Sequence, residues 1–130
     1  MIAVFSYLDL LGRQFVKAGD DPIAGFDCWG AARIVARRLG LQDPGPALDP
    51  AAVDVRLVAL RAEPRALELG DIVKWDPRPG LIHVAPIVAL GRSAASVMAL
   101  HARIGHESCA VPISLFGREC AVYRLDKAVP

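Results

Sequence analysis

The spacing of apolar and polar positions predicts an α-helix that begins at a cysteine. Small or apolar residues recur at i, i+3, i+4, i+7 and i+11, so they form one stripe of a helix: Cys28, Ala31, Ala32, Val35 and Leu39. Asp27 is a favoured N-cap residue, and Gly40 is a favoured residue just beyond a helix end. The pattern therefore predicts a helix over residues 28–39.

Two further segments have helical spacing. In the N-terminal segment 1–11 the apolar residues share one helical face, which predicts an amphipathic first helix. Asp49 followed by Pro50 resembles an N-cap with proline at the first helical position. We therefore expect a short helix over Pro50 to Ala62, although Val55 and Val58 interrupt its period.

The second half of the chain has short apolar runs, rich in β-branched residues and separated by glycine and proline, which predict strands. They cover residues 72–75, 83–90, 96–102 and 120–125. Helices followed by a run of antiparallel strands are typical of an α+β domain. With 130 residues, the chain (1–130) is predicted to form a single domain.

The second and third of these strands are predicted to form a hairpin. In the simplest register, His101 lies opposite Ala85, and the side chains of His83 and His101 point to the same face. Pro86 cannot donate a hydrogen bond to a neighbouring strand. We therefore expect its strand to lie at an edge of the sheet or to contain a bulge there.

Cys28 is the candidate nucleophile. The unpaired N–H groups and positive dipole end of a helix N-terminus stabilise a thiolate, so we expect the pKa of Cys28 to lie below its ordinary value. The turn-rich segment 18–22 can deliver the thiol into a cleft. His83 and His101 could complete a Cys–His catalytic pair. Taken alone, Cys28 is also consistent with a buried structural cysteine, and each histidine with a core or surface residue.

Composition argues against several classes of function. The 15 basic and 14 acidic residues leave a net charge of +1, which is not the electrostatic footprint of a nucleic-acid-binding protein. The arginines of segment 33–38 are expected to form a solvated helix face. No run approaches the roughly 18 apolar residues of a membrane span. The N-terminus lacks the features of a signal peptide, so we expect synthesis and retention in the cytoplasm or assembly there into something larger.

The three cysteines do not suggest a disulfide framework, because their number is odd. Cys109 and Cys120 could pair only in an oxidising compartment. His101, His106 and Cys109 lie close enough in sequence to suggest a zinc site, but their spacing matches no regular structural zinc motif. We therefore expect neither a metal nor a cofactor.

Four short segments carry a family resemblance: GFDCWG at 25–30, LGDIV at 69–73, IHV at 82–84 and LHA at 100–102. This ordered set resembles the NlpC-type papain-like cysteine peptidases over nearly the whole chain, from about Leu11 to Arg124. The resemblance implies a papain-like α+β fold with N-terminal helices packed on a small antiparallel sheet. The tryptophan after the cysteine resembles the phage tail-assembly branch of the family.

The resemblance assigns a role to each matching residue. Cys28 would be the nucleophile, His83 the general base, and His101 the polar residue that orients the His83 ring. The Cys28 backbone N–H, at a helix start capped by Asp27, would help to form an oxyanion hole. Three residues are candidates for the substrate cleft: Phe15, Trp29 and Ile82.

The chain departs from the family pattern at three places. The family usually has a tyrosine whose hydroxyl faces the oxyanion site, where this chain has Phe15. A pair of glycines in the loop before the nucleophile is Ala18-Gly19 here, and the glycine after the HV dipeptide is Ala85, followed by Pro86. These departures bear on activity rather than on the fold.

The resemblance implies hydrolysis of an amide bond in a peptidoglycan stem peptide, at a γ-linked D-glutamate. The tail-assembly likeness adds a place in a phage or prophage tail tip, with tail-tip proteins as partners. There the domain would aid cell-wall penetration or tail assembly. Two alternatives stay open: a catalytically weak or inactive structural tail component, and an acyltransferase that uses the same Cys–His chemistry.

Overall fold

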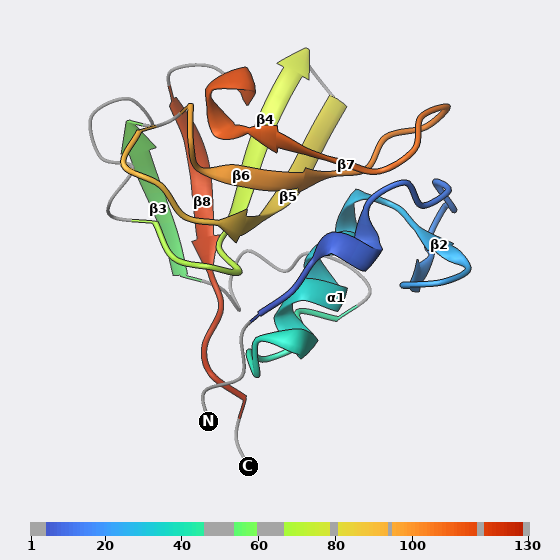
Figure 1. Cartoon of the computed structure of the whole chain (residues 1–130). Coiled ribbons are helices and arrows are strands. Elements are labelled where there is room, and N and C mark those ends of the chain that lie inside the picture. Colours follow the sequence, from blue (N-terminus) through green and yellow to red (C-terminus); the bar gives the residue numbers. More distant parts are fainter. Residues whose placement is uncertain are drawn as a thin grey trace.

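The computed structural model describes residues 5–45, 54–59, 67–78, 81–93, 95–116 and 119–128. Within these ranges a single α-helix, α1 (Cys28–Arg38), lies beside an antiparallel sheet (Figure 1). The chain therefore has the α+β architecture that the sequence predicts. In the described part of the chain, no helix has the length and apolar character needed to cross a membrane.

The helix that starts at Cys28 forms as predicted. It ends at Arg38, and Gly40 follows with a φ of 70°, a left-handed conformation that glycine adopts without a steric penalty. The small and apolar side chains of α1 are buried: Ala31, Ala32, Ile34, Val35 and Ala36. Local periodicity and its two end signals are therefore enough to define this element.

Six strands form one antiparallel sheet in the order β3-β8-β4-β5-β6-β7. Their bounds are as follows: β3 (Asp54–Ala59), β4 (Ile72–Arg78), β5 (Leu81–Ala89), β6 (Met98–His101), β7 (Cys109–Pro112) and β8 (Glu119–Arg124). A separate pair of short strands, β1 (Asp20–Asp21) and β2 (Gly25–Phe26), contacts α1. The helix itself packs against β5 in the interior of the large sheet.

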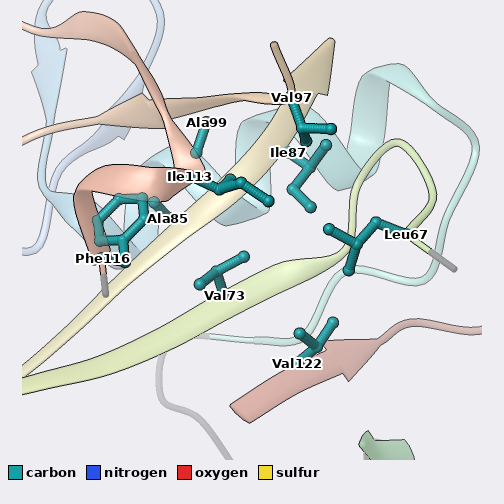
Figure 2. Close-up of a cluster of buried hydrophobic side chains, with 9 residues drawn as sticks. All are labelled: Leu67, Val73, Ala85, Ile87, Val97, Ala99, Ile113, Phe116 and Val122. Atoms are coloured by element: carbon teal, nitrogen blue, oxygen red, sulfur yellow. The ribbon is translucent and has the colours of Figure 1, made fainter. Parts of the chain in front are cut away.

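Strand β5 is buried on both faces. Its residues Val84 and Val88 pack in the apolar clusters that contain α1, whereas Ala85 and Ile87 point to the opposite face. Figure 2 shows the cluster on that opposite face, which includes the 3-10 helix η4 (Ile113–Phe116): Leu67, Val73, Ala85, Ile87, Val97, Ala99, Ile113, Phe116 and Val122. Burial on both sides explains why the sequence of β5 is almost continuously apolar.

The predicted first helix over residues 1–11 is wrong in its described part. Residues 5–7 are not helical, and only a short 3-10 helix, η1 (Leu8–Leu10), forms. Leu10 is fully buried in a cluster with α1, while Leu8 is 68% exposed. The apolar residues therefore anchor an irregular segment instead of forming one helical face. Residues 1–4 lie outside the described ranges.

The predicted helix over Pro50 to Ala62 is also wrong. Residues 54–59 form β3, which pairs along its whole length with β8. Val55 and Val58, which interrupt the helical period, are β-branched residues that favour strands. The rest of the predicted helix, 50–53 and 60–62, lies outside the described ranges.

The predicted hairpin of the two histidine-bearing strands is confirmed. β5 and β6 are antiparallel, and Ile87 pairs with Ala99 in the predicted register. Nearer the turn an irregularity shifts the pairing, so that Ala89 lies opposite Met98. β7 and η4, which follow β6, have no counterpart in the prediction.

Pro86 lies in an interior strand, so the first of the two predicted alternatives, an edge strand, is wrong; the second, a bulge, is close to what forms, because the pairing of β5 with β6 is irregular between Ile87 and Ala89. Ile87 directs its N–H to the carbonyl of Asp71 at 2.8 Å and its carbonyl to the N–H of Gly70 at 2.9 Å. Because backbone groups alternate along a strand, Pro86 faces away from β4, toward β6. The hydrogen bond that proline cannot donate would therefore go to β6, the neighbour with which the pairing of β5 is irregular.

The arginines of α1 lie on a solvated face, as predicted: Arg37 and Arg38 are exposed, and Arg33 is partly exposed. They bind aspartates on the surrounding loops: Arg33 and Arg37 with Asp20 and Asp43, and Arg38 with Asp9. The last pair is bidentate, with nitrogen–oxygen distances of 2.6 and 2.7 Å. These ion pairs connect the helix to the segments that precede and follow it.

Candidate active site

The side chain of Asp27 holds the start of α1. One carboxylate oxygen accepts a hydrogen bond from the Gly30 amide at 2.7 Å, as expected of an N-cap. The other accepts a hydrogen bond from the Ala18 amide at 2.8 Å, which joins the preceding loop to the helix. Cys28 is therefore the first helical residue, at a helix start that is fixed on two sides.

Close backbone packing explains two glycines of the GFDCWG segment. A Cβ atom on Gly30 would collide with the carbonyl oxygen of Gly19, and one on Gly25 would collide with the carbonyl oxygen of Gln14. Gly25 also has a φ of 124°, which side-chain-bearing residues rarely adopt. The two glycines thus allow the loop to lie directly against the start of α1, beside the thiol.

Ala18 occupies the left-handed region, with a φ of 59°. This conformation costs a residue with a side chain about 1 kcal/mol. The position corresponds to the first glycine of the pair in the family pattern. The loop therefore keeps a backbone that suits glycine, and Ala18 is strained in it.

The Cys28 thiol is half-buried and packs in the cluster that contains Val84. The pKa of Cys28 is raised above its ordinary value, mainly by burial and in smaller part by the Asp27 carboxylate. The backbone amides of Val84, Trp29 and Cys28 act in the opposite direction, but their effect is smaller. The predicted lowering of the Cys28 pKa is therefore wrong for the unliganded domain. The helix start does favour the thiolate, but the loss of water around the sulfur has the larger effect.

His83 and His101 lie together, on the same face as the hairpin register predicts. Their ring centroids are 4.6 Å apart and their planes are inclined at 81°, so the edge of one ring meets the face of the other. The ring of Phe116 lies 6.5 Å from that of His83 and 6.0 Å from that of His101. Phe116 thus belongs to the site although the sequence did not suggest it.

Burial favours the neutral form of both imidazoles. Burial first, and then the charges of His101 and Arg103, together lower the pKa of His83 to about 4. The pKa of His101 is lowered first by burial and then by Arg103 and His106. At pH 7 His83 is therefore neutral, which is the protonation state that a general base requires.

The thiol and His83 are brought to the same end of β5. The amide that donates to the Cys28 sulfur belongs to Val84, the residue directly after His83. The backbone N–H and C=O groups of successive residues in β5 point alternately to β4 and to β6. Those of Ile87 point to β4, so the amide of Val84 points away from β4, toward the side where β6 ends at His101. The backbone of β5 at Val84 therefore lies beside the start of α1, and His83 is the neighbouring residue on this strand.

This arrangement has a counterpart among solved structures. The chain is similar to the crystal structure of the NlpC/p60 domain of the peptidoglycan hydrolase SagA, with a TM-score of 0.61 and 27% sequence identity. The match covers 87% of this chain and 88% of that one. This structural neighbour supports the resemblance to the NlpC-type family that the sequence motifs carry. The fold of the chain is accordingly the papain-like α+β fold that the sequence motifs imply. No family model matches the chain, and no curated protein does.

The structure places the three predicted cleft residues in different surroundings. Phe15 lines an open depression of about 480 Å³. Trp29 is half-buried, and its indole N–H donates to the Gly45 carbonyl at 2.7 Å, a contact that holds the loop after α1. Ile82 lies in β5, next to His83 in sequence, and its side chain is outside the described part.

The LGD segment at 69–71 supports the sheet. Asp71 is 2% exposed and accepts hydrogen bonds from the Arg124 guanidinium at 3.0 and 2.8 Å. It also accepts a hydrogen bond from the Glu68 amide at 2.9 Å. This buried ion pair joins the start of β4 to β8 and so stabilises the sheet that carries His83.

The zinc alternative is wrong for the described residues. In those ranges, no three side chains of His, Cys, Asp or Glu are grouped in a way that could hold a metal ion. His106 binds Arg103 instead, with its Nε2 atom 2.9 Å from Arg103 Nη2. Cys109 is exposed and carries a free thiol.

Proposed function

We propose that this domain is a cysteine peptidase that hydrolyses amide bonds in the stem peptides of peptidoglycan. The observation that supports the proposal is the amide of Val84, which donates to the Cys28 sulfur and directly follows a neutral His83 that packs on His101. The substrate class is suggested by the likeness to SagA, which is a peptidoglycan hydrolase.

In the first half of the reaction, the Cys28 sulfur attacks the carbonyl carbon of the scissile amide. His83 takes the thiol proton as the new carbon–sulfur bond forms, because it is neutral and next to the site. The oxygen of the tetrahedral intermediate receives a hydrogen bond from the backbone N–H of Cys28 at the start of α1. His101 positions the His83 ring through their edge-to-face contact.

In the second half of the reaction, the carbon–nitrogen bond breaks and the leaving amine takes the proton from His83. A thioester between Cys28 and the acyl part of the peptide remains. His83 then accepts a proton from a water molecule that attacks the thioester carbonyl. Release of the acid returns the proton to the sulfur and restores the neutral pair.

Digestion of purified murein, followed by mass spectrometry of the released peptides, tests this proposal. We expect cleavage by the unmodified chain and a loss of at least about a thousandfold in Cys28→Ala and His83→Ala, because both groups act in bond cleavage. Cys109→Ala is the control for the removal of a thiol as such, since this thiol is exposed and lies on β7. Cleavage that survives in Cys28→Ala would refute cysteine catalysis.

A structural tail component that keeps the fold but lacks activity is the second candidate. Two observations favour it: Phe15 has no hydroxyl to offer an oxyanion, and burial raises the pKa of the Cys28 thiol. It predicts that neither intact murein nor soluble muropeptides are cleaved. It also predicts that iodoacetamide modifies Cys28 no faster than it modifies Cys109 at neutral pH.

We further propose that the domain is made in the cytoplasm and is then carried in a phage or prophage tail tip. Trp29, directly after the nucleophile, motivates this role, because it matches the tail-assembly branch of the family. Proteomic mass spectrometry of purified particles from the producing strain tests it. We expect the chain in the tail fraction; its presence only in the cell lysate would contradict the role.

A further inference from the structure

Residues 10–16 form an irregular strap that runs between the start of β7 and β2 (Figure 1). Leu10 ends η1, and the rest of the strap lies outside the helices and strands of the fold. The backbone N–H and C=O groups of such a segment need partners elsewhere, because leaving them unpaired in a folded domain is costly. The partners of the strap lie on two different parts of the molecule.

Ser108 holds the first end of the strap with four hydrogen bonds. Its hydroxyl donates to the Leu10 carbonyl at 2.5 Å and accepts from the Arg13 amide at 2.8 Å. Its backbone N–H donates to the Arg13 carbonyl at 2.9 Å, and its carbonyl accepts from the Gly12 amide at 2.8 Å. Ser108 is 4% exposed, so water does not readily replace these bonds. The backbone and the side chain of Ser108 therefore both bind the strap.

The first end of the strap is also attached to the strand that bears His101. Ser108 directly precedes β7, whose first residue lies opposite His101 in the pairing of β6 with β7. Leu10 is fully buried in one apolar cluster with Leu100 and Ala102, the residues on either side of His101. This end of the strap is thus fixed to the end of β6.

The other end of the strap is paired with β2, which leads directly into the candidate nucleophile. The Phe26 amide donates to the Gln14 carbonyl at 3.2 Å, and the Val16 amide donates to the Phe26 carbonyl at 3.3 Å. The Val16 carbonyl accepts from the Gly19 amide at 2.8 Å, and the Gly19 carbonyl accepts from the Asp27 amide at 3.2 Å. A continuous series of hydrogen bonds therefore leads from the strap to the residue that caps α1.

We propose that Ser108 is a positioning residue for the reaction proposed above: by holding the strap, it keeps the strand that bears His101 and the segment that delivers Cys28 in a fixed relative position. This inference rests on the peptidase function, in which the two sides act together. The body of α1 also packs on β5, and the strap adds a connection through the residues that precede the helix. Such a connection matters because a misplacement of reacting groups by about 1 Å can cost up to a hundredfold in rate.

Hydrogen–deuterium exchange, resolved by residue with NMR, tests whether the strap transmits a change at Ser108. Ser108→Ala keeps the backbone bonds of this residue but removes both bonds of its hydroxyl. We expect the amides of Val16 and Phe26, at the far end, to exchange about tenfold faster, because the strap opens more often without these buried hydrogen bonds. Ser108→Cys keeps the size of the side chain but bonds weakly, so it should change the same rates in the same direction by a smaller factor.

Cleavage kinetics on a soluble muropeptide test the positioning role itself. For Ser108→Ala we expect a kcat about tenfold lower than that of the unmodified chain and a KM within about twofold, because misplaced groups weaken the transition state more than the binding of substrate. A merely structural role would lower the urea midpoint but leave kcat unchanged at a temperature at which the variant is folded.

Ser96→Ala is the matched control. The Ser96 hydroxyl also makes two hydrogen bonds to a loop residue, in the connection after β5: it accepts from the Ser93 amide and donates to the Ser93 carbonyl, both at 3.1 Å. This loop does not contact the strap through any of these bonds. Ser96→Ala should therefore leave kcat and the exchange of the Val16 and Phe26 amides unchanged.

Exchange and cleavage are separate readouts, so the two proposals can fail independently. Faster exchange that is confined to the amides of Gly12 and Arg13 overturns the positioning role, and so does an unchanged kcat in folded Ser108→Ala when the unmodified chain cleaves. No cleavage by the unmodified chain refutes the peptidase function, whereas the exchange at Val16 and Phe26 still decides whether the strap couples the two sides. If Ser108→Ala does not fold, the same rates in Ser108→Cys decide the matter.

Discussion

The two sides of the candidate active site are built by different interactions. On the cysteine side, polar contacts determine position: the Asp27 carboxylate bonds to two amides, and Gly30 lets the loop backbone lie on the helix. On the histidine side, His83 and His101 stack edge to face beside Phe116, in apolar surroundings. One side is held by hydrogen bonds and close backbone contact, and the other is held by burial.

The position of the Cys28 sulfur and the protonation state of His83 therefore have different physical causes. The polar side fixes where the sulfur lies, but Asp27 adds a negative charge that opposes the thiolate. The apolar side sets the protonation state, since burial keeps His83 neutral at pH 7. The resting site is therefore a neutral thiol and a neutral imidazole; in the proposed mechanism they exchange a proton during the attack rather than before it.

The largest expected effect is that of Gly30→Ala, on the cysteine side. Alanine inside a helix is normally more stable than glycine by about 1 kcal/mol. Here the new methyl group would occupy the space of the Gly19 carbonyl oxygen, so the loop or the helix start must move. We expect the free energy of unfolding in urea to fall by about 3 kcal/mol, a magnitude typical of overpacking.

Gly40→Ala is the control for this substitution. Gly40 also has a positive φ, of 70°, but a Cβ atom there would meet nothing within 4 Å. It should therefore cost only the conformational penalty, about 1 kcal/mol. Equal losses in the two variants would show that close packing at Gly30 is not what positions Cys28.

The next effect is a pH dependence of stability that comes from the histidine side. The pKa of His83 is about 4 in the folded chain and 6.5 ordinarily, so between these values the unfolded chain binds the extra proton. Stability should therefore fall as the pH drops from 6.5 to 4. We expect a loss of roughly 2 kcal/mol in urea unfolding, which allows for the partial exposure of the ring.

The ion pairs of α1 titrate at a lower pH than His83, so their effect on stability can be separated from that of His83. Hydrogen bonds from Arg38 and Arg33 lower the pKa of Asp9 and Asp43 below the ordinary 3.8, so these ion pairs weaken only at a still lower pH. His83→Gln should flatten the stability profile between pH 6.5 and 4. His101 keeps a smaller slope there, because its pKa is lowered too. An unchanged slope in His83→Gln would contradict the assignment.

The sequence predicts best those features whose causes are local. The helix from Cys28 follows from its period, its N-cap Asp27 and the glycine beyond its end, all within 13 residues of one another in the printed sequence. The shared face of His83 and His101 follows from the two-residue period of paired strands. β3 could not be predicted in this way, because its partner β8 lies at the other end of the sheet-forming half of the chain.

The electrostatics of the site could not be predicted, for a related reason. The dipole of α1 is visible in the sequence, but the burial of Cys28 against Val84 depends on how the helix packs on β5. Phe116 likewise reaches the histidines from η4, which no motif marks. Motifs thus located the chemical groups, whereas their protonation depends on neighbours that only the fold brings together.

A smaller effect is expected from the ion pair between Arg38 and Asp9. The pair is bidentate but partly exposed, with 30% of the Arg38 side chain and 51% of the Asp9 side chain accessible to solvent. A double-mutant cycle of Arg38→Gln and Asp9→Asn should give a coupling energy of about 0.5 to 1 kcal/mol. It should weaken in 1 M salt, unlike the losses on the apolar side. A coupling energy of zero at low salt would show that this pair does not contribute to holding α1 in place.

The smallest effect, and the only gain in stability, is expected from Ala18→Gly. Ala18 has a φ of 59°, and glycine relieves this strain while it keeps the backbone amide that donates to Asp27. Glycine also increases the entropy of the unfolded chain, so the net gain should be only about 0.5 kcal/mol. Ala24→Gly in the same loop region is the control: Ala24 is exposed and has no positive φ, so glycine there should destabilise by a similar amount. Both changes are measured as shifts of the urea midpoint. A rise for Ala18→Gly together with a fall for Ala24→Gly would show that the backbone strain lies at Ala18. Two losses of equal size would instead mean that the loop relaxes around alanine at no cost.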